Sequence, residues 1–283
     1  MKFQSPPPLV ASYWTLAGRF PGRGEAHSRF GFTERVVAAR KAGFCGLGLL
    51  DADLKHILQT SSLQECKRIL DDQGITHLEL EFLVDWFEEG EKRRAADSAK
   101  EFLFEAAAEL GSSLIKVGDF SRSACPMPRL TDAFGVLCAQ AQRRGVRIAF
   151  EPMGAAVIHD FDSALALVRG ASAPNGGLAI DIWHMTDLGV PFKQVSTIPR
   201  EFLFCVELND AKTKVGVPSK LSEDRCFCGQ GDLDIRGFIE AVELTGFDRP
   251  WGIELFSEEL AQMGLTEAAN LAFATSQKQF LSR

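Results

Sequence analysis

The chain alternates between short apolar runs typical of buried strands and longer segments in which apolar residues recur every three or four positions. The short runs predict eight strands, near residues 9–13, 45–50, 76–83, 113–118, 146–151, 177–181, 202–207 and 250–255. The longer segments predict helices over Phe32–Ala42, Leu63–Asp72, Lys92–Leu110, Arg129–Arg144, Asp162–Val168, Ile235–Leu244 and Glu258–Phe280. Glycines at the expected helix ends support this division, because Gly43, Gly74, Gly111, Gly145 and Gly246 each precede a predicted strand.

This alternation of strands and helices predicts the fold class. Eight β-then-α units in 283 residues indicate an α/β protein that forms a single (β/α)8 TIM barrel. No linker or shift in composition divides the chain, so we expect residues 1–283 to form one domain. A doubly wound open sheet is the alternative, but the turn at Trp14–Gly24 is long, lacks the Gly-x-Gly-x-x-Gly pattern and does not open a helix directly.

Composition and charge exclude several classes of protein. The chain is 46% hydrophobic, yet it has no apolar run of the ~20 residues that a membrane span needs. The first residues show no secretion signal, so we expect a cytoplasmic protein. Its seven cysteines are odd in number and scattered, which argues for reduced thiols. A net charge of -7 without a basic stripe argues against a nucleic-acid partner.

Four predicted strands in the second half of the chain end in an acidic residue. These acids are Glu151, Asp181, Glu207 and Glu254, and two positions before each stands Ala149, Ala179, Cys205 or Gly252. Side chains alternate along a strand, so each acid and its small neighbour share a face. In a barrel the carboxyl ends of the strands carry the pocket. Any single acid there is more simply a helix cap or an ion-pair partner, but four on consecutive strands favour a shared role.

Carboxylates gathered in this way repel one another unless a cation joins them. We therefore predict one divalent metal ion bound by Glu151, Asp181, Glu207 and Glu254. An all-oxygen ligand set suits Mn²⁺ first, with Mg²⁺ or Co²⁺ as alternatives. The spacing Asp181-x-x-His184 would let Asp181 bind the ion while His184 reaches the substrate.

These positions carry a resemblance to a known family. Glu151-Pro152, Asp181-x-x-His184, the strand-7 acid and Glu254, with the run 225–234, resemble the xylose isomerase-like TIM-barrel superfamily of sugar isomerases and epimerases. The resemblance covers nearly the whole chain. Its members also include inosose dehydratase, 3-dehydroshikimate dehydratase and a repair-nuclease type, the last of which the net charge and the five histidines disfavour.

The resemblance implies roles for individual residues. In the superfamily the matching acids of strands 5, 6 and 8 bind one divalent ion, and the two glutamates carry protons on opposite faces of the substrate. It thus implies that Glu151 and Glu254 are the catalytic acid and base. The strand-7 position is usually His or Gln three residues before an Asp. Here it is Glu207, a departure that leaves Asn209 or Asp210 as alternative ligands.

The loop after predicted strand 7 supplies a candidate for substrate binding. The superfamily's R-x-x-P-G-x-G loop corresponds to 225–231, with Cys228 in place of the proline. The resemblance implies that Arg225 holds a substrate oxygen.

Charged and aromatic residues on other strands are further candidates. On strands 3 and 4, Glu79, Glu81 and Lys116 should face the barrel interior, with Glu81 and Lys116 either forming a buried ion pair or touching substrate. Four tryptophans complete the set. Trp14, Trp86 and Trp183 are expected at the pocket face and Trp251 in the core. For Trp14, the position is equally consistent with core packing and with contact to the substrate.

Together these features predict an enzyme acting on a small carbohydrate-like molecule. The leading hypothesis is a metal-dependent isomerase or epimerase of a ketose or related polyhydroxy carbonyl compound, which removes a proton next to the carbonyl to give a metal-stabilised enediolate. The alternative is a lyase or dehydratase, in which the same enolate expels a β-substituent with His184 or Lys116 as the acid. A non-catalytic binding protein is a third possibility. Relatives in the superfamily favour a homo-oligomer.

Overall fold

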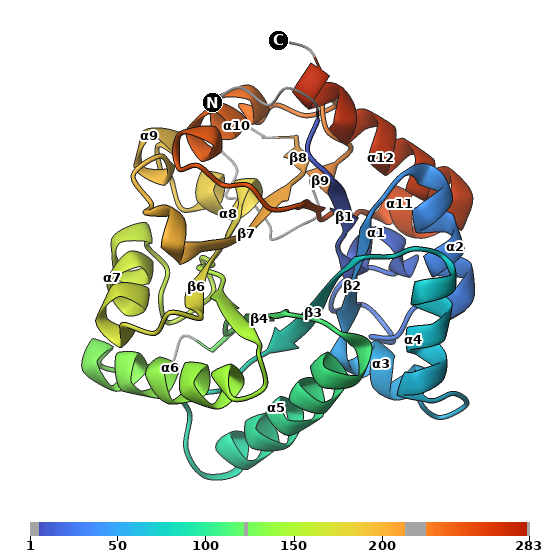
Figure 1. The fold of residues 1–283 in the computed structure, drawn as a ribbon. Coiled ribbons are helices and arrows are strands. Elements are labelled where there is room, and N and C mark those ends of the chain that lie inside the picture. Colours follow the sequence, from blue (N-terminus) through green and yellow to red (C-terminus); the bar gives the residue numbers. More distant parts are fainter. Residues whose placement is uncertain (1–5, 122–123, 213–224, 282–283) are drawn as a thin grey trace.

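Eight parallel strands close into a barrel with helices around it (Figure 1), in the computed structural model that describes residues 6–121, 124–212 and 225–281. Neighbouring strands follow the order β1-β10-β7-β6-β5-β4-β3-β2. The predicted (β/α)8 barrel is therefore confirmed. The barrel strands are β1 (Leu9–Ala11), β2 (Gly46–Leu50), β3 (His77–Leu83), β4 (Leu114–Val117), β5 (Arg147–Phe150), β6 (Gly176–Asp181), β7 (Leu203–Leu208) and β10 (Trp251–Ile253).

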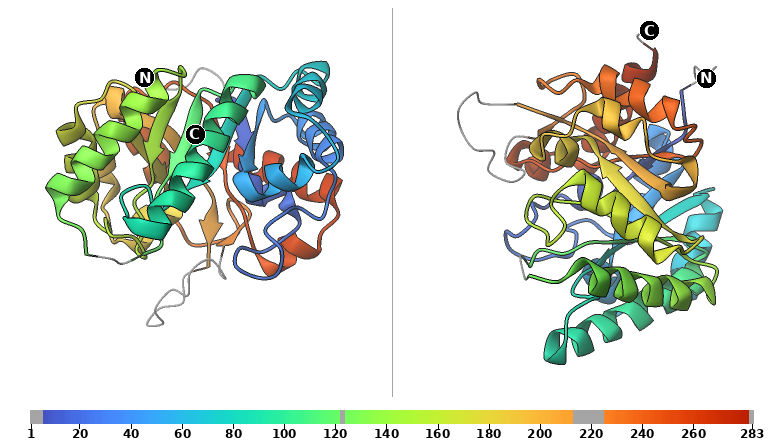
Figure 2. Two further views of the ribbon diagram at one scale, coloured as in Figure 1. Left: turned by 90° about the horizontal axis from the view of Figure 1, so that it is seen from below. Right: turned by 90° about the vertical axis from the view of Figure 1, so that its left-hand side faces the viewer.

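The long helices lie on the outside of the strands in both side views (Figure 2), and most match the predicted ranges. Glycines end several of them as expected: Gly43, Gly74, Gly111, Gly145 and Gly246 all have positive φ. The long helices are α2 (Phe32–Ala42), α4 (Leu63–Asp72), α5 (Gly90–Leu110), α6 (Met127–Gln142), α7 (Phe161–Ala171), α10 (Ile235–Leu244) and α12 (Leu265–Leu281).

The helix predicted over Glu258–Phe280 is wrong in one respect, because it is two helices. α11 (Glu258–Gln262) is followed by Met263 in extended conformation, and α12 begins at Leu265. The carbonyl of Met263 accepts a hydrogen bond from the Arg29 guanidinium. The carbonyl of Met263 thus forms a contact with a residue distant in sequence, and the periodicity of apolar residues does not reveal such a contact.

Several short elements in the connections between the barrel strands were not predicted. The expectation that the turn after β1 does not open a helix directly is wrong, because a short helix begins two residues after the strand. Comparable short helices follow β2 and β6. Helices shorter than about two turns leave too little periodicity to be recognised in sequence. These elements are α1 (Tyr13–Ala17), α3 (Asp51–Ile57), α8 (Ile182–Asp187), α9 (Phe192–Val195), the 3-10 helix η1 (Arg200–Phe202), and the antiparallel ribbon of β8 (Asp210–Ala211) and β9 (Arg225–Cys226).

The apolar core lies mainly between the strands and the helices. Trp251 is fully buried there, as predicted, in edge-to-face contact with Phe238, Phe247 and Phe280. A much smaller apolar group fills the inside of the barrel, made of Leu114, Ala149, Ala179, Phe204 and Cys205. The barrel interior is therefore left largely to polar side chains. Among the described residues, no helix is long and apolar enough to cross a membrane.

Candidate metal centre and active site

The four acids singled out in the sequence converge at the carboxyl end of the barrel. One carboxylate oxygen from each of Glu151, Asp181, Glu207 and Glu254 lies within 4.8 Å of the others, and all four residues are buried. Strand register explains part of this, because Asp181 on β6 pairs with Glu207 on β7. The predicted convergence is confirmed.

Small residues make room for these long side chains. Gly252 on β10 is the register partner of Glu207, and a Cβ atom at Gly252 would lie 2.8 Å from Cγ of Glu207. Such a distance is shorter than real side chains adopt, so glycine is required for Glu207 to reach the centre. Ala149, Ala179 and Cys205 pack together in the layer below.

Arg225 joins two of the four carboxylates. Its Nη1 donates to Oδ2 of Asp181 at 3.1 Å and to Oε2 of Glu254 at 2.9 Å. The guanidinium also lies over the rings of Trp183, at 5.2 Å, and Phe256, at 4.2 Å. Arg225 comes from β9, so the ribbon after β7 contributes a cation that contacts the four-acid cluster.

Lys116 on β4 joins two other carboxylates below the pocket. Its Nζ lies 2.9 Å from Oε2 of Glu81 and 2.7 Å from Oε1 of Glu207. The predicted Glu81–Lys116 ion pair is confirmed. Lys116 has no exposed surface. Burial opposes its charge, but Glu207 and Glu81 outweigh burial and raise the Lys116 pKa well above the usual value.

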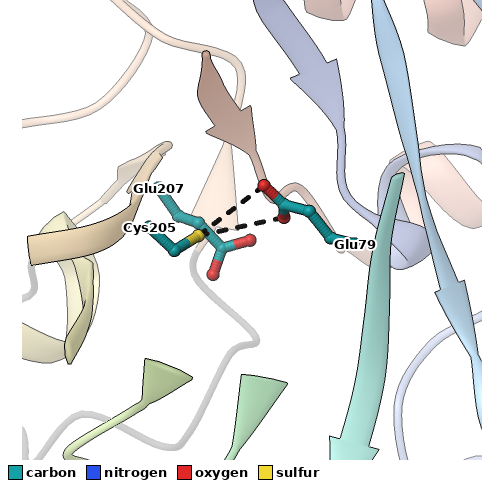
Figure 3. Close-up of side chains that lie close together, drawn as sticks. All are labelled: Glu79, Cys205 and Glu207. Atoms are coloured by element: carbon teal, nitrogen blue, oxygen red, sulfur yellow. Dashed lines mark hydrogen bonds between the residues drawn. The ribbon is translucent and has the colours of Figure 1, made fainter. Parts of the chain in front are cut away.

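Glu207 also takes part in a second, deeper layer of side chains (Figure 3). There the Cys205 thiol donates to both carboxylate oxygens of Glu79, each at 3.8 Å. Glu79 lies on β3 and Cys205 and Glu207 on β7, so this layer spans the barrel interior. Burial and the charge of Glu79 raise the Cys205 pKa well above its usual value, which keeps the thiol protonated. The inward direction predicted for Glu79 is thus correct.

Burial and mutual repulsion change the protonation of the site. Both effects raise the pKa of Glu151 well above its usual range, with Glu254 the main repelling charge. Burial likewise raises the pKa values of Glu207 and Glu254. Burial lowers the pKa of His184 to about 4, so His184 is neutral at pH 7, with Nε2 3.6 Å from Oε1 of Glu151.

Two oxygens of the centre lack hydrogen-bond partners among the described residues. They are Oε1 of Glu151 and Oε2 of Glu207, both buried. Unpartnered buried carboxylate oxygens are costly in a metal-free protein, and a cation among them would satisfy both. The residues present therefore fit a divalent metal ion.

The alternative strand-7 ligands have other contacts. Asn209 donates from Nδ2 to Oδ2 of Asp181 at 2.7 Å. Asp210 accepts from the backbone amides of Gly229 at 2.8 Å, Gly231 at 2.9 Å and Leu233 at 3.1 Å. Asp210 therefore anchors the loop beyond β9, and Glu207 is the strand-7 residue that lies in the four-acid cluster.

A pocket of about 500 Å³ opens beside the four-acid cluster. Every catalytic candidate lines it, as do most of the substrate-binding candidates, including Trp14, which lies on α1. The expectation for Trp86 is wrong, because its ring packs against Phe134 and Phe150 in the core. The predicted residues that line the pocket are Trp14, Glu81, Glu151, Trp183, His184, Arg225 and Glu254.

Other pocket residues were missed in the sequence. Phe82, Phe120, Met153 and Phe256 line its walls. Phe256 stands two positions after Glu254. If the alternation of side chains is extended past the end of the strand, Phe256 is expected on the same face as Glu254. Phe120 follows β4 in a loop, where no periodicity gives a side chain's direction.

Enzymes are among the proteins to which this chain is similar. It is 29% identical over 231 residues to the 3-dehydroshikimate dehydratase of Pseudomonas aeruginosa, a match that covers 80% of this chain and 36% of that protein. It is 26% identical over 138 residues to the inosose isomerase of Bacillus subtilis, covering 48% of this chain and 49% of the isomerase. The chain thus spans about half, or less, of the length of these curated relatives.

The fold also matches a solved structure described as the IOLI protein with a binding zinc atom. The TM-score is 0.85 at 20% identity, covering 96% of this chain and 98% of the other. A model of the xylose isomerase-like TIM barrel family matches residues 36–277. With the closed barrel and the converging acids, this match shows that the chain belongs to the xylose isomerase-like TIM barrel family.

Proposed function

We propose that this protein is a divalent-metal-dependent isomerase or epimerase of a ketose or related polyhydroxy carbonyl compound. The observation that carries the proposal is the convergence of four buried carboxylates, two of them with unpartnered oxygens, beside a pocket that Glu151 and Glu254 line. Such a site suits removal of a proton from a carbon next to a carbonyl group.

Glu151, Asp181, Glu207 and Glu254 would hold the metal ion. When bound, the ion supplies a Lewis acid that polarises the substrate carbonyl and stabilises negative charge on its oxygen. Oxygen ligands favour Mn²⁺, with Mg²⁺ or Co²⁺ as alternatives. The zinc atom named for the similar IOLI protein supports a divalent ion in this fold without selecting among metals.

Glu151 and Glu254 would move the substrate's proton. They extend from β5 and β10, so they approach the pocket from different strands, and each lines it. Burial raises the pKa values of both above the usual range, so each carboxyl holds a proton more readily than an exposed glutamate does. In an epimerase one carboxylate accepts the proton and the other carboxylic acid delivers one to the opposite face.

His184 and Arg225 would orient the substrate. Neutral His184 has an unpartnered Nδ1 and lies beside Glu151, so its ring can hydrogen-bond a substrate oxygen near the reacting carbon. Arg225 keeps Asp181 and Glu254 in position through its Nη1 atom, and its Nε has no partner among the described residues. That buried Nε–H group is a donor without a partner in a residue that lines the pocket.

A second candidate function is a lyase or dehydratase. The match to a dehydratase over 80% of this chain favours it. Proton removal by Glu151 or Glu254 would be the same, but the electrons would expel a β-hydroxyl or other leaving group that must be protonated. Lys116, the other predicted acid, is fully buried and paired with Glu81 and Glu207, whereas His184 lines the pocket. Because burial keeps the imidazole neutral at pH 7, His184 would first have to take up a proton, for which Glu151 at 3.6 Å is placed, before it could protonate a leaving group.

Deuterium exchange distinguishes these reactions. Metal-loaded protein is incubated in D₂O with ketoses, keto-cyclitols and oxidised glycosides, and products are followed by mass spectrometry. Deuterium gained without loss from the skeleton indicates isomerisation or epimerisation, whereas loss of water or another group indicates a lyase. Replacement of Glu151 or Glu254 by Gln should lower turnover about 10²- to 10⁴-fold.

A control variant separates chemistry from folding. Leu244→Ala alters an exposed side chain on α10, far in sequence from Glu151 and outside the pocket, and should leave turnover unchanged. Full turnover in both Glu151→Gln and Glu254→Gln would refute the proposed function. The metal content and melting temperature of each variant show whether activity is lost because the protein no longer binds metal or no longer folds.

A further inference from the structure

Aromatic rings form much of the pocket wall. Trp14, Phe82, Phe120, Trp183 and Phe256 all line it, together with aliphatic side chains, while the acids and Arg225 are gathered at one end. Its volume of about 500 Å³ lies within the range of about 300–1,000 Å³ typical of pockets for drug-sized ligands. A small polyhydroxylated chain would satisfy the polar end and leave the aromatic walls in contact with water.

Phe120 marks the outer part of this wall. Its side chain is 66% exposed, and its ring lies 5.7 Å from the ring of Phe82, which also lines the pocket. Contiguous apolar patches, unlike single exposed residues, often mark ligand-binding surfaces, and Phe120 and Phe82 are in contact at the pocket. An apolar group on the ligand would cover Phe120 and Phe82 together.

The charges of the pocket oppose an anionic ligand. Among its described lining residues the only cation is Arg225, whose Nη1 is already shared by Asp181 and Glu254. Lys116 is buried beneath the pocket between two carboxylates. A phosphate or carboxylate on the aromatic wall would therefore have Arg225 as its only cationic partner among these residues, and it would compete for that guanidinium with Asp181 and Glu254.

We infer that the substrate is a neutral keto sugar that carries an aryl group. The sugar would lie over the four-acid cluster, and the aryl group against Phe82, Phe120 and the neighbouring rings. This inference rests on the proposed function, which supplies the keto sugar, and adds the neutral charge and the aryl substituent. A neutral aryl-bearing substrate differs from a carboxylate substrate such as 3-dehydroshikimate.

Binding of unreactive glycosides tests the inference without turnover. Metal-loaded protein is titrated with methyl β-glucoside, phenyl β-glucoside and phenyl β-glucuronide, none of which has the ketone needed for proton removal. Calorimetry should show that phenyl β-glucoside binds at least about tenfold more tightly than methyl β-glucoside, because its ring buries more apolar surface. The anionic glucuronide should bind more weakly than phenyl β-glucoside.

Variants locate the aryl group. Phe120→Ala should reduce the advantage of phenyl over methyl β-glucoside by about threefold or more, since it removes one wall of the binding surface. Leu244→Ala, which removes an apolar side chain that is 74% exposed and lies outside the pocket, should leave both affinities unchanged. Equal affinities for the two glucosides, or tighter binding of the glucuronide, would overturn the inference.

Turnover separates this inference from the proposed function. The 3-keto derivatives of methyl and phenyl β-glucoside are incubated with the protein in D₂O. Exchange with both compounds at equal efficiency, without loss of a group, would support the proposed function and overturn the aryl preference. Elimination with both compounds at equal efficiency would support the lyase reaction instead and would also overturn the aryl preference. Preferential binding of phenyl glycosides without exchange in any keto sugar would support the aryl site and refute the proposed function.

Discussion

Lys116 is central to the charge balance inside the barrel. The described interior holds more carboxylates than cations, and Lys116 contacts two of those carboxylates with no access to water. A buried charge is tolerated only when it is paired, so each member of this group depends on the others. The group consists of Glu79, Glu81, Glu151, Asp181, Glu207 and Glu254 with Lys116 and Arg225.

Removal of Lys116 should therefore destabilise the protein strongly. Lys116→Met leaves Glu81 and Glu207 without their cation, and we expect a loss of about 3–5 kcal/mol in the free energy of unfolding. Adding Glu207→Gln should restore part of it, with a coupling energy of about 1–3 kcal/mol. Urea denaturation of the metal-free proteins measures both values.

An exposed ion pair provides the control for the double-mutant comparison of Lys116→Met and Glu207→Gln. Arg236 and Glu240 lie 3.0 Å apart on α10, and both side chains are largely exposed. Arg236→Met should change the free energy of unfolding by less than about 1 kcal/mol. Additive effects of Lys116→Met and Glu207→Gln would show that the two residues are not coupled.

At the scale of elements, the short strand β10 positions the centre through a glycine. A methyl group at Gly252 would meet Cγ of Glu207 at 2.8 Å and Oγ of Ser12 at 3.1 Å. Ser12 itself donates to Oε1 of Glu207 at 2.5 Å, so the strand ends of β1, β7 and β10 are packed around one carboxylate.

Gly252→Ala should disturb both stability and metal binding. We expect a loss of about 1–3 kcal/mol in the free energy of unfolding, because the added methyl group overpacks the barrel interior. Metal affinity, measured by calorimetry, should fall because Glu207 is displaced. Gly264→Ala is the matched control, since a methyl group added at Gly264 would meet no atom within 4 Å. Equal metal affinity in the two variants would contradict this account.

The loop that follows β9 is fixed by Asp210 on β8. The carboxylate accepts from three amides of that loop, Gly229, Gly231 and Leu233, and the strand pair β8–β9 carries Arg225. Asp210→Ala would leave these amides without their acceptor, so we expect Arg225 to lose its fixed position and KM to rise about tenfold.

A helix cap provides the comparison for Asp210. Asp234 accepts from the amide of Gly237 at 2.9 Å at the start of α10. Asp234→Ala should cost about 1 kcal/mol in the free energy of unfolding without a matching change in KM. A similar KM in both variants would show that Asp210 does not position Arg225.

At the scale of the whole molecule, the acid cluster links stability to pH and metal. The folded-state pKa values of Glu151, Glu207 and Glu254 are raised. Groups of this kind add stability that is fully present below the unfolded pKa of about 4.3 and is lost as pH rises through the folded pKa. Metal-free protein should therefore lose this contribution between about pH 4.3 and the raised values.

Metal should reverse this loss, because it binds the ionised carboxylates. Mn²⁺ at about 100 times its Kd should add ~2.7 kcal/mol to the free energy of unfolding. Melting temperatures with Mn²⁺ and with EDTA should differ more at about pH 8 than at about pH 5. Asp181→Asn should diminish the metal effect and the exposed variant Glu240→Gln should not. A metal effect that is constant with pH would contradict the prediction.

Other predictions about the whole molecule stay predictions. One domain over residues 1–283, cytoplasmic location, the absence of a nucleic-acid partner and a homo-oligomer are expectations from the sequence alone. Sedimentation at micromolar concentration tests the last of these, and a monomer would contradict it.

The barrel strands, most of the long helices, the barrel itself and the four acids could be predicted from the sequence. Strand alternation and the small residues Ala149, Ala179 and Gly252 were enough, because these are local patterns that the fold repeats. The same local reasoning failed at the end of α11 and for Trp86. In both cases contacts with distant residues, Arg29 for the helix end and Phe134 and Phe150 for the ring, decided the outcome.

Most of the charge pairing and the surroundings of the pocket follow from contacts between distant segments, which the sequence does not reveal. Lys116 was expected beside Glu81, but its second contact with Glu207 depends on the closure of the barrel, which brings β4 and β7 within reach of one another. Phe120 and Phe82 likewise become one wall only in three dimensions. Periodicity gives the face of an element on which a side chain lies, whereas barrel closure and loop conformation determine which distant side chains it meets.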